Sequence, residues 1–410
     1  MKIVVHKYGG TSVADIARIR AVARRVATAA RTERVAVVVS AQAGETDRLI
    51  GLARKLMPEP HARDMDLLIA TGEQASVALL SLALRCEGLA TETFLGFQAG
   101  IVTDGNHGRA RIEHIDPARV RAALEAGRIA VVAGFQGMSF DGRVTTIGRG
   151  GSDTSAVALA TALSADRCEI FTDVEGIKSA DPRICPDAKL LKCITYEEMM
   201  ELADTGAKVL HTRCVELAAK HGVPLVVRSS FTEGEGTRVV PEERRLEGTV
   251  VTGISLTKGE AKVAIRKVPD RIGVTARIFK PIAKAGIDVD LILQNVSEDG
   301  YTDLTFTVPK GDLRRAMTLA SLAARDVEAG RVEAAGDIAK VSVVGLGMRS
   351  HAGVAHTMFA ALAEDGIAIQ MIGTSEIKVS IVVGIHQAER AVRVLHEAFG
   401  LSFSTGAPVA

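Results

Sequence analysis

The sequence lacks the features that mark membrane, disulfide-bonded and nucleic-acid-binding proteins. Its five cysteines are odd in number and form no CxxC pair, which argues against a disulfide framework and a zinc site. The formal net charge is only +1, so there is no electrostatic footprint for nucleic acid or a lipid surface. No apolar run approaches the roughly 18 residues that span a bilayer, and no signal-type segment precedes the first strand-like run. We expect a cytoplasmic protein whose partners are small molecules or copies of itself.

The familiar nucleotide-binding signatures are also missing. There is no GK dipeptide, hence no Walker A loop, and there is no HRD or DFG triplet of a protein kinase. The segment GLGMRS at residues 345–350 lacks the third glycine of a dinucleotide-binding fingerprint. A kinase with this sequence therefore needs a different fold.

Two glycine-rich turns are present instead. KYGGTS at residues 7–12 closes a β-branched run, and GRGGSDT at residues 148–154 opens an apolar helix-like stretch. Glycines let the backbone approach a ligand, and the N–H groups at a helix start point toward negative charge. Because each turn carries a cation, Lys7 or Arg149, the two turns predict phosphate chemistry on a carboxylate substrate.

The 410 residues are enough for two or three domains. Up to about residue 230, short β-branched runs alternate with alanine-rich amphipathic stretches, which is typical of an α/β domain with a largely parallel sheet. The runs expected as strands are 3–6, 35–39, 129–133, 168–172 and 225–228. Ligands bind beyond the carboxyl ends of such strands, where the glycine-rich and polar motifs lie.

A polar segment around residues 232–245 marks a boundary, and an internal repeat follows it. Residues 273–286 align without gaps on residues 353–366. Each copy has the pattern strand, helix, strand, strand of a ferredoxin-like α+β unit. We expect a catalytic domain over residues 1–245 and repeats over 262–335 and 336–410. A strand-like segment at 249–256 could complete the second repeat rather than the first.

Eight motifs occur in one order along the chain, and together they are far more specific than any one glycine turn. They are KYGGTSV at 7–13, VSA at 39–41, TGE at 71–73, GFQG at 134–137, TIGRGGSDT at 146–154, FTDVEG at 171–176, SADPR at 179–183 and GAK at 206–208. Through them the sequence resembles the aspartate kinases of the amino-acid-kinase superfamily, and the repeat resembles their paired ACT domains, which bind amino-acid effectors. The resemblance implies an α/β kinase domain with a mainly parallel sheet, followed by two ferredoxin-like ACT repeats. It also implies transfer of the ATP γ-phosphoryl group to the β-carboxylate of L-aspartate.

The resemblance implies roles residue by residue. Lys7 and Asp153 would be catalytic, and the further ATP-binding residues would be Gly9, Gly10, Thr172, Asp173, Lys178, Asp181, Arg183 and Lys208. The aspartate-binding residues would be Ser40, Thr46, Glu73, Arg149, Gly150, Gly151 and Ser152. Mg²⁺ would accompany ATP, held mainly by phosphate oxygens, so no protein metal site is expected. Lys178 stands where many members have an aromatic residue, which leaves the contacts to the nucleotide there open.

The chemistry of these residue types agrees with the implied roles. A carboxylate nucleophile needs no base near neutral pH, so positioning and charge stabilisation must do most of the catalysis. Arg149 would pair with the substrate α-carboxylate, and Glu73 would hold the α-ammonium group. Simpler structural roles remain open, since Ser40 could be a turn serine and Ser152 and Asp153 could cap a helix.

The effector is expected at a seam between paired repeats. Its contacts would be Asp270, Ile272, Gly273, Asp290, Gln294, Asn295, Ser375 and Glu376. The resemblance implies inhibition by lysine, threonine or both, as befits the first step toward lysine, threonine and methionine. It also implies a homo-oligomer that pairs through the ACT repeats, and a shorter regulatory chain is an alternative partner.

Two other functions are alternatives to an aspartate kinase. One is another amino-acid kinase, acting on glutamate or N-acetylglutamate, and the other is a catalytically silent amino-acid sensor. An N-acetylated substrate has no α-ammonium group and would leave Glu73 without a partner. A silent sensor would be expected to have lost Lys7, Arg149 or Asp153, yet all three are present. The sequence therefore favours the aspartate kinase.

Overall fold

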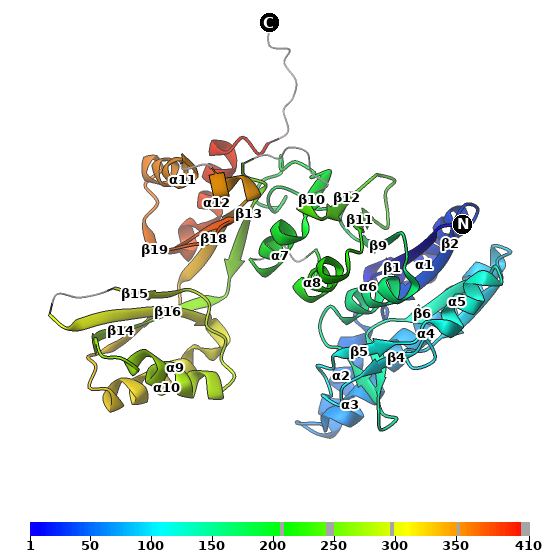
Figure 1. Ribbon diagram of the computed structural model, residues 1–410, viewed down its shortest axis with the longest axis horizontal. Coiled ribbons are helices and arrows are strands. Elements are labelled where there is room, and N and C mark those ends of the chain that lie inside the picture. The colour runs from blue at the N-terminus through cyan, green and yellow to red at the C-terminus, as the bar shows by residue number, and fades with distance from the viewer. Residues whose placement is uncertain (206–208, 243–249, 296–298, 351–352, 403–410) are drawn as a thin grey trace, which may run out of the picture. The chain divides into compact units, whose positions relative to one another are not determined.

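The computed structural model describes residues 1–205, 209–242, 250–295, 299–350 and 353–402 (Figure 1). The chain divides into two compact units. The first holds Met1–Lys178, Leu190–Asp204 and the described residues of Lys208–Glu247. The second holds Ser179–Lys189, Thr205 and the described residues from 250 onward.

The first unit is built on an eight-stranded sheet with the order β10-β12-β11-β9-β1-β2-β6-β3. Neighbouring strands are parallel except for the antiparallel pair β11 and β12, which confirms the expected α/β class with a mainly parallel sheet. The strands are β1 (Ile3–Tyr8), β2 (Arg34–Val39), β3 (Thr91–Phe94), β6 (Ile129–Ala133), β9 (Arg167–Thr172), β10 (Cys193–Thr195), β11 (Leu225–Ser229) and β12 (Thr237–Val240). The central strands are continuous apolar runs because both faces of the sheet are covered.

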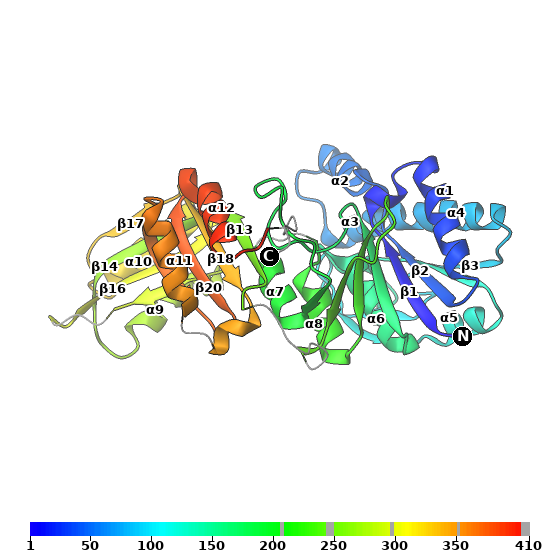
Figure 2. The ribbon, with the colours of Figure 1, turned by 90° about the horizontal axis from the view of Figure 1, so that it is seen from above.

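Helices cover both faces of this sheet (Figure 2). On one face α1 (Ile16–Ala29) packs beside α4 (Thr71–Cys86), and their apolar side chains share a core with β1, β2 and β6. In α1 the buried residues Ile19, Val22, Ala23 and Val26 recur at helical spacing, which turns one stripe toward the sheet. The opposite face carries α5 (Ala118–Glu125), α6 (Gly151–Leu163) and α8 (Thr212–His221), and α7 (Tyr196–Asp204) packs on α8.

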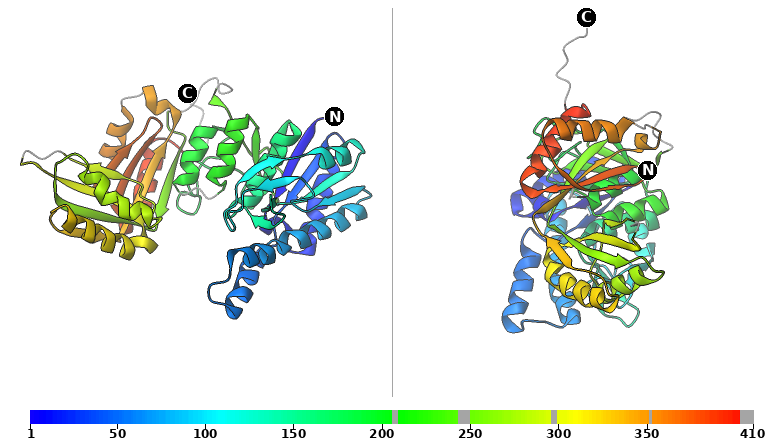
Figure 3. Two further views of the ribbon diagram at one scale, coloured as in Figure 1. Left: turned by 60° about the horizontal axis from the view of Figure 1, so that its bottom comes forward. Right: turned by 90° about the vertical axis from the view of Figure 1, so that its left-hand side faces the viewer.

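A small four-stranded sheet in the first unit was not predicted from the sequence. Its order is β5-β4-β7-β8, with β4 (Ile101–Thr103), β5 (Ile112–Ile115), β7 (Gln136–Ser139) and β8 (Val144–Thr146). Helices α2 (Glu45–Leu56) and α3 (Ala62–Ile69) pack together, and α3 also lies against β8. Figure 3 shows these two helices, drawn in blue, projecting from the rest of the unit.

The expectation that no run is long and apolar enough to cross a bilayer needs one correction. The helical stretch Ala62–Cys86, which joins α3 to α4, passes that test by length and composition. Half of its most apolar window is buried inside the protein.

The second unit contains two antiparallel four-stranded sheets, each with two helices. The first repeat has the order β15-β16-β14-β17, from β14 (Glu260–Pro269), β15 (Ile292–Gln294), β16 (Tyr301–Pro309) and β17 (Val332–Ala335), with α9 (Val274–Lys284) and α10 (Leu313–Asp326). The second has the order β13-β18-β20-β19, from β13 (Gly253–Lys258), β18 (Ile338–Val344), β19 (Ile369–Thr374) and β20 (Lys378–Gly384), with α11 (Gly353–Glu364) and α12 (Ala388–Ala398). The internal repeat read from the sequence is thus a repeat of structure.

The strand β13 precedes the first repeat in sequence but belongs to the sheet of the second. It runs antiparallel to β18, with Gly253 opposite Val344 and Lys258 opposite Ala339. It takes the place beside β18 that β17 takes beside β14 in the first repeat. The first repeat is therefore an insertion between two neighbouring strands of the second.

Residues 179–189 also join the second repeat, which departs from an unbroken catalytic domain over 1–245. Ala180, Cys185 and Ala188 are buried in the apolar core of that repeat. The Ile254 N–H donates to the Ser179 carbonyl at 2.7 Å. The sequence pattern could not show this, because the segment finds its core among residues far along the chain.

Candidate active site

A buried ion pair lies where β1 meets the start of α6. The Lys7 Nζ atom lies 2.6 Å from the Asp153 Oδ1 atom, and only 8% of Lys7 is exposed. Lys7 is the next-to-last residue of β1. Tyr8, the last residue, lies in the core that β1 shares with α1 and α4. Because side chains alternate along a strand, Lys7 points to the opposite face of the sheet. A Cβ atom added at Gly9 would lie 3.4 Å from Lys7 Nζ, so the glycine turn passes close to the ammonium group.

The turn that carries Arg149 depends on two glycines. Gly148 has φ +87° and Gly150 has φ +71°, both in the left-handed region that favours glycine. A Cβ atom at Gly150 would lie 2.5 Å from the His211 Cβ atom. Gly150 is itself the N-cap of α6, without a side-chain cap. The alternative that Ser152 or Asp153 caps this helix is therefore wrong, and Asp153 instead pairs with Lys7 from the first turn.

Glu73 is a buried carboxylate, and one of its two oxygens accepts no hydrogen bond from the described residues. It lies in the first turn of α4 with 3% exposure, and its Oε1 atom accepts from the Ala41 N–H at 2.9 Å. The buried Oε2 atom has no hydrogen-bond partner among the described residues. Burial raises the pKa of Glu73 to about 7, against the lowering effect of the Ala41 N–H. This oxygen suits a cationic group from a ligand.

The loop after β2 packs against the first glycine turn. The Ser40 N–H donates to the Tyr8 carbonyl at 3.1 Å, and the Ala43 N–H donates to the Gly10 carbonyl at 3.1 Å. A Cβ atom at Gly10 would lie 2.7 Å from the Ala41 carbonyl oxygen, so this packing requires glycine. Thr46 lies in the first turn of α2, so Ser40 and Thr46 flank one short loop.

The GFQG segment approaches the start of α6 from the other side. Phe135 has φ +65°, an uncommon value for a residue other than glycine, and its N–H donates to Ser155 Oγ at 3.1 Å. A Cβ atom at Gly134 would lie 2.8 Å from the Ser152 Cβ atom. The structure thus fixes the helix start that carries Gly151, Ser152 and Asp153.

A cleft of about 1080 Å³ opens beside this helix start. Arg149, Gly150 and Asp153 line it, and so do residues that the sequence analysis missed, namely His211 and the cationic Arg109, Arg111, Arg213 and Lys220. Burial, and after it the charge of Arg111, lowers the pKa of the Arg213 guanidinium. The two arginines within residues 109–111 were the available signal, but they lie outside any glycine motif.

The expected nucleotide residues fall into three groups. Thr172 and Asp173 follow β9, and β9 is the parallel neighbour of β1, so they lie near the Lys7 turn. The Gly9 N–H donates to the Phe171 carbonyl at 3.3 Å, so this amide is already used within the protein. Lys178 forms a β-bridge with Leu190.

The second group, Asp181 and Arg183, lies outside the first unit. The third consists of Lys208 alone, which lies outside the described residues. Asp181 and Arg183 belong to the second unit, where Arg183 Nη2 lies 2.6 Å from Asp181 Oδ2. This ion pair lowers the pKa of the Asp181 carboxyl.

Several expected effector residues gather at the start of α9. Gly273 is its N-cap with φ +87°, and Thr275 Oγ1 donates to Gln294 Oε1 at 3.1 Å. The Asp270 N–H donates to the Gly300 carbonyl at 2.9 Å, and Ile272 is fully exposed. Asn295, the residue after Gln294, lines a cavity of about 690 Å³.

Three further effector candidates lie elsewhere in the second unit. Ser375 and Glu376 lie in the turn between β19 and β20, and the Ser375 N–H donates to the Lys378 carbonyl at 2.8 Å. Asp290 pairs with Lys340 of the second repeat.

Comparison with known proteins identifies the family of this chain. Residues 2–229 match the amino acid kinase family, and residues 263–319 and 341–399 each match an ACT domain. The aspartokinase of Pseudomonas aeruginosa is 51% identical over 98% of both chains. The chain belongs to the aspartokinases of the amino acid kinase family. An aspartokinase of Mycobacterium tuberculosis is 47% identical over 98% of this chain and 97% of its own.

Solved aspartokinases share the fold over nearly the whole chain. Escherichia coli aspartokinase III in complex with aspartate and ADP, described as the R-state, is 28% identical with a TM-score of 0.80. That match covers 97% of this chain and 99% of the other. The same enzyme in complex with lysine and aspartate, described as the T-state, is 27% identical with a TM-score of 0.76 over 97% of this chain and all of that one.

These relatives confirm the expected family and enzyme class. Curated relatives with about half of their residues identical over the full chain are named aspartate kinase. The chain is therefore an aspartate kinase.

Proposed function

We propose that this aspartate kinase transfers the γ-phosphoryl group of ATP to the β-carboxylate of L-aspartate, giving 4-phospho-L-aspartate. The observation that carries the proposal is the buried Lys7–Asp153 pair beside a glycine turn. A buried cation held by a single carboxylate can still meet a further anion, and phosphate oxygens are the anions such a turn accommodates. The aspartate and ADP bound by the Escherichia coli relative support the same substrates.

Aspartate would be held at both of its α-substituents. Arg149 would pair with the α-carboxylate through its guanidinium fork, and the free Oε2 atom of Glu73 would accept from the α-ammonium group. Ser40 and Thr46 would contact the β-carboxylate from the loop after β2. Gly150, Gly151 and Ser152 complete this side at the start of α6, where backbone N–H groups favour negative charge.

The transfer step needs no proton removal. A β-carboxylate with a pKa of about 3.9 is ionised near neutral pH, so its oxygen can attack the γ-phosphorus directly. The bond from that phosphorus to the bridging oxygen breaks as the new bond forms, and ADP leaves with the electron pair. Catalysis then rests on alignment and on stabilising the charge of the transferring group.

Lys7 would supply that stabilisation. Asp153 holds the ammonium group at 2.6 Å, so the charge is oriented before the substrate arrives and little reorganisation is needed. The further nucleotide contacts would be Gly9, Gly10, Thr172, Asp173, Lys178, Asp181, Arg183 and Lys208. Mg²⁺ would enter with ATP, held mainly by phosphate oxygens and water, and would neutralise phosphate charge.

Regulation would come from the second unit. We propose inhibition by lysine, threonine or both, through residues around Gly273 and Gln294 and the turn that holds Ser375 and Glu376. The lysine bound by the T-state relative supports an amino-acid effector of this kind. The protein would act in the cytoplasm as a homo-oligomer paired through its ACT repeats, and its product would lead to lysine, threonine and methionine.

A side-by-side assay tests the substrate. L-aspartate, L-glutamate and N-acetyl-L-glutamate are each offered with ATP and Mg²⁺, ADP release is coupled to a spectroscopic readout, and hydroxylamine traps the acyl phosphate. We expect turnover and a trapped hydroxamate with aspartate alone. Faster turnover of glutamate or N-acetylglutamate than of aspartate would refute the proposal.

A further inference from the structure

The turn that carries Arg149 cannot hold that side chain in place by itself. It contains two glycines in the left-handed region, and Arg149 is exposed on a flexible stem. A side chain that must pair with a small carboxylate has to be held to within a fraction of an ångström. The backbone on either side of the turn must therefore be fixed by something else.

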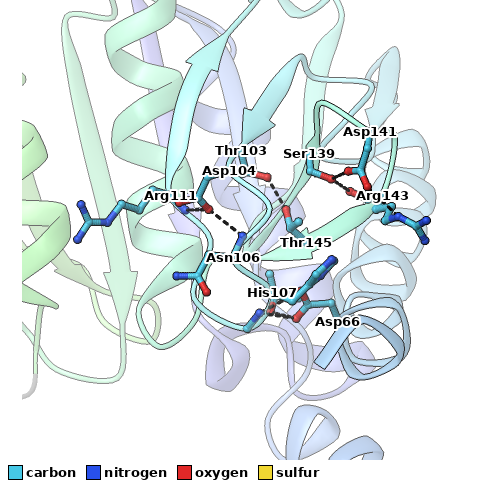
Figure 4. Close-up of polar contacts among 12 residues, drawn as sticks. Asp66, Thr103, Asp104, Asn106, His107, Arg111, Ser139, Asp141, Arg143 and Thr145 are labelled. Atoms are coloured by element: carbon cyan, nitrogen blue, oxygen red, sulfur yellow. Dashed lines mark hydrogen bonds and ion pairs between the residues drawn. The ribbon is translucent and has the colours of Figure 1, made fainter. Parts of the chain in front are cut away.

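One fully buried carboxylate, that of Asp66, fixes the backbone that precedes the Arg149 turn (Figure 4). Asp66 of α3 is 0% exposed, and its Oδ1 atom accepts from Thr146 Oγ1 at 2.5 Å. The His107 Nδ1 atom lies 2.7 Å from Oδ2, and the Gly108 N–H lies 3.0 Å from both carboxylate oxygens. Thr146 is the last residue of β8, three residues before Arg149.

The loop held by Asp66 interlocks with the turn. The Ala110 N–H donates to the Thr146 carbonyl at 2.9 Å, and the Gly108 carbonyl oxygen would lie 3.0 Å from a Cβ atom at Gly148. Arg213 of α8 fastens the same two segments, because its Nη1 and Nη2 atoms donate to the Ile147 and Ala110 carbonyls at 3.0 Å each. The backbone before Arg149 is thus held by two side chains from different helices.

Asp66 also shares a helical stretch with Glu73. The stretch Ala62–Cys86 carries both residues, with Asp66 in α3 and Glu73 in the first turn of α4. Asp66 therefore connects the segment that bears Glu73 to the turn that bears Arg149. An apolar residue in its place would leave the buried Thr146 hydroxyl and the part-buried Gly108 N–H without these partners.

We infer that Asp66 is a positioning residue that sets the spacing between the groups that bind the two α-substituents of the amino-acid substrate. The inference rests on the proposed roles of Arg149 and Glu73. Asp66 itself touches neither substrate, since its two oxygens are turned toward Thr146, His107 and Gly108. Its loss should therefore weaken recognition of aspartate and leave recognition of ATP nearly unchanged.

Four variants of the full-length enzyme test this. Asp66→Asn removes the charge, and Thr146→Val removes the hydroxyl at nearly constant volume. Thr146→Ser restores the hydroxyl and serves as the rescue. Asp141→Asn makes the same carboxylate-to-amide change in the turn of the same small sheet, where Asp141 contacts Ser139 and Arg143 (Figure 4).

We expect Asp66→Asn to raise the KM for aspartate at least tenfold and Thr146→Val to raise it severalfold. The KM for ATP should stay within twofold, and Thr146→Ser and Asp141→Asn should stay within twofold for both substrates. The preference for L-aspartate over its α-carboxamide should fall in Asp66→Asn and Thr146→Val, because the α-carboxylate contact is the one displaced. A purely structural role would not produce this split.

Arg149→Ala separates failure of the inference from failure of the proposed function. If Arg149→Ala leaves the KM for aspartate unchanged, the proposed role of Arg149 is wrong. If Arg149→Ala raises that KM but Thr146→Val leaves it unchanged, Arg149 keeps its role and the inference fails. Equal increases in both KM values, or a Thr146→Ser variant as impaired as Thr146→Val, would also overturn the inference. Should Asp66→Asn not fold, the two Thr146 variants decide alone.

Discussion

Two buried lysines in this protein have similar exposure but different surroundings. Lys7 in the first unit is 8% exposed and has one carboxylate, Asp153, at 2.6 Å. Lys340 in the second unit is 6% exposed and has two, Glu260 with its Oε1 atom at 2.9 Å and Asp290 in still closer contact. Glu260 and Asp290 belong to the first repeat and Lys340 to the second, so the second cluster joins the repeats.

The number of neighbouring carboxylates distinguishes the proposed catalytic lysine, Lys7, from the lysine that connects the two repeats, Lys340. Burial lowers the pKa of Lys340, but hydrogen bonds to Asp290 and Glu260 outweigh it and hold that pKa above its usual value. The positive charge of this ammonium group is already balanced by two carboxylates. Lys7 has a single carboxylate beside a glycine turn, and an ammonium group has three donors, so it can accept a further anion. Each of the following experiments breaks or sharpens this contrast.

Replacing Lys7 should have the largest effect. We expect Lys7→Met to lower kcat by about 10³-fold or more, because the charge on the transferring phosphoryl group loses its oriented cation. The sequence alone suggests that a strand-end lysine could be removed without cost to folding. The structure shows instead that Asp153 would be left buried without its partner, at a cost of about 3 kcal/mol of unfolding free energy.

The double variant Lys7→Met with Asp153→Asn separates these two effects. It removes both charges, so denaturant unfolding should return most of the lost stability while kcat stays low. Recovery of activity together with stability would show that Lys7 acts only in folding.

Breaking the Lys340 cluster should have the opposite profile. We expect Lys340→Met to lower the unfolding free energy of the second unit by roughly 1–3 kcal/mol, because the largely buried Glu260 carboxylate loses its cation, while the loss at the half-exposed Asp290 is screened by solvent. Without effector, kcat and both KM values should stay within twofold. Thermal unfolding measures the stability, and the coupled assay measures kcat and both KM values. The control is Lys258→Met, which breaks an exposed ion pair with Glu389. A large loss of kcat would mean that the Lys340 cluster takes part in catalysis.

Glu73 and Arg149 should show intermediate effects directed at one substrate. We expect Glu73→Gln and Arg149→Lys to raise the KM for aspartate by roughly 10-fold to 100-fold, with a much smaller effect on ATP. Because the pKa of Glu73 is raised to about 7, the ionised form that attracts an ammonium group is lost as pH falls through 7. The KM for aspartate should therefore rise from pH 8 to pH 6 in the wild type, and Glu73→Gln should flatten that profile. Equal damage toward both substrates would contradict the assignment.

The smallest effects belong to the effector contacts. We expect Gln294→Ala or Ser375→Ala to weaken inhibition by lysine or threonine severalfold, which corresponds to about 1 kcal/mol of coupling. Each variant is compared with its own uninhibited rate, across lysine, threonine and their mixture. A wild-type enzyme that responds to none of these would refute the regulatory proposal and leave the kinase assignment intact.

The sequence predicted the features that short-range patterns encode. The strand Ile129–Ala133 falls where the apolar pattern placed it, and the strands that end at Tyr8 and Thr172 lead into the expected motifs. These elements are specified by periodicity and glycine turns within a few residues. The proximity of the Lys7 turn to Thr172 and Asp173 follows as well, because β1 and β9 are parallel neighbours whose carboxyl ends meet at one edge of the sheet.

The rest depends on contacts between distant parts of the chain. The small sheet of β4, β5, β7 and β8, the Asp66 cluster and the place of residues 179–189 have no local signature. Helix capping by Asp153 was a reasonable reading of the helix start, but it failed because Gly150 occupies the N-cap and a lysine from β1 takes the carboxylate. A single sequence does not show which of two compatible partners an ionised side chain will choose.

The placement of β13 imposes an order on how this protein can be made. During synthesis β13 emerges before the whole first repeat, but its neighbour β18 emerges only afterwards, with Gly253 opposite Val344. The first repeat has all four of its own strands and can close while β13 waits as an unpaired edge. The second repeat must then form a long-range pairing across a folded insertion, a slow kind of step because the loop must close before the contact is gained. A nascent chain stopped near Ala335 would therefore carry a complete first repeat together with an exposed strand, the kind of edge that promotes aggregation.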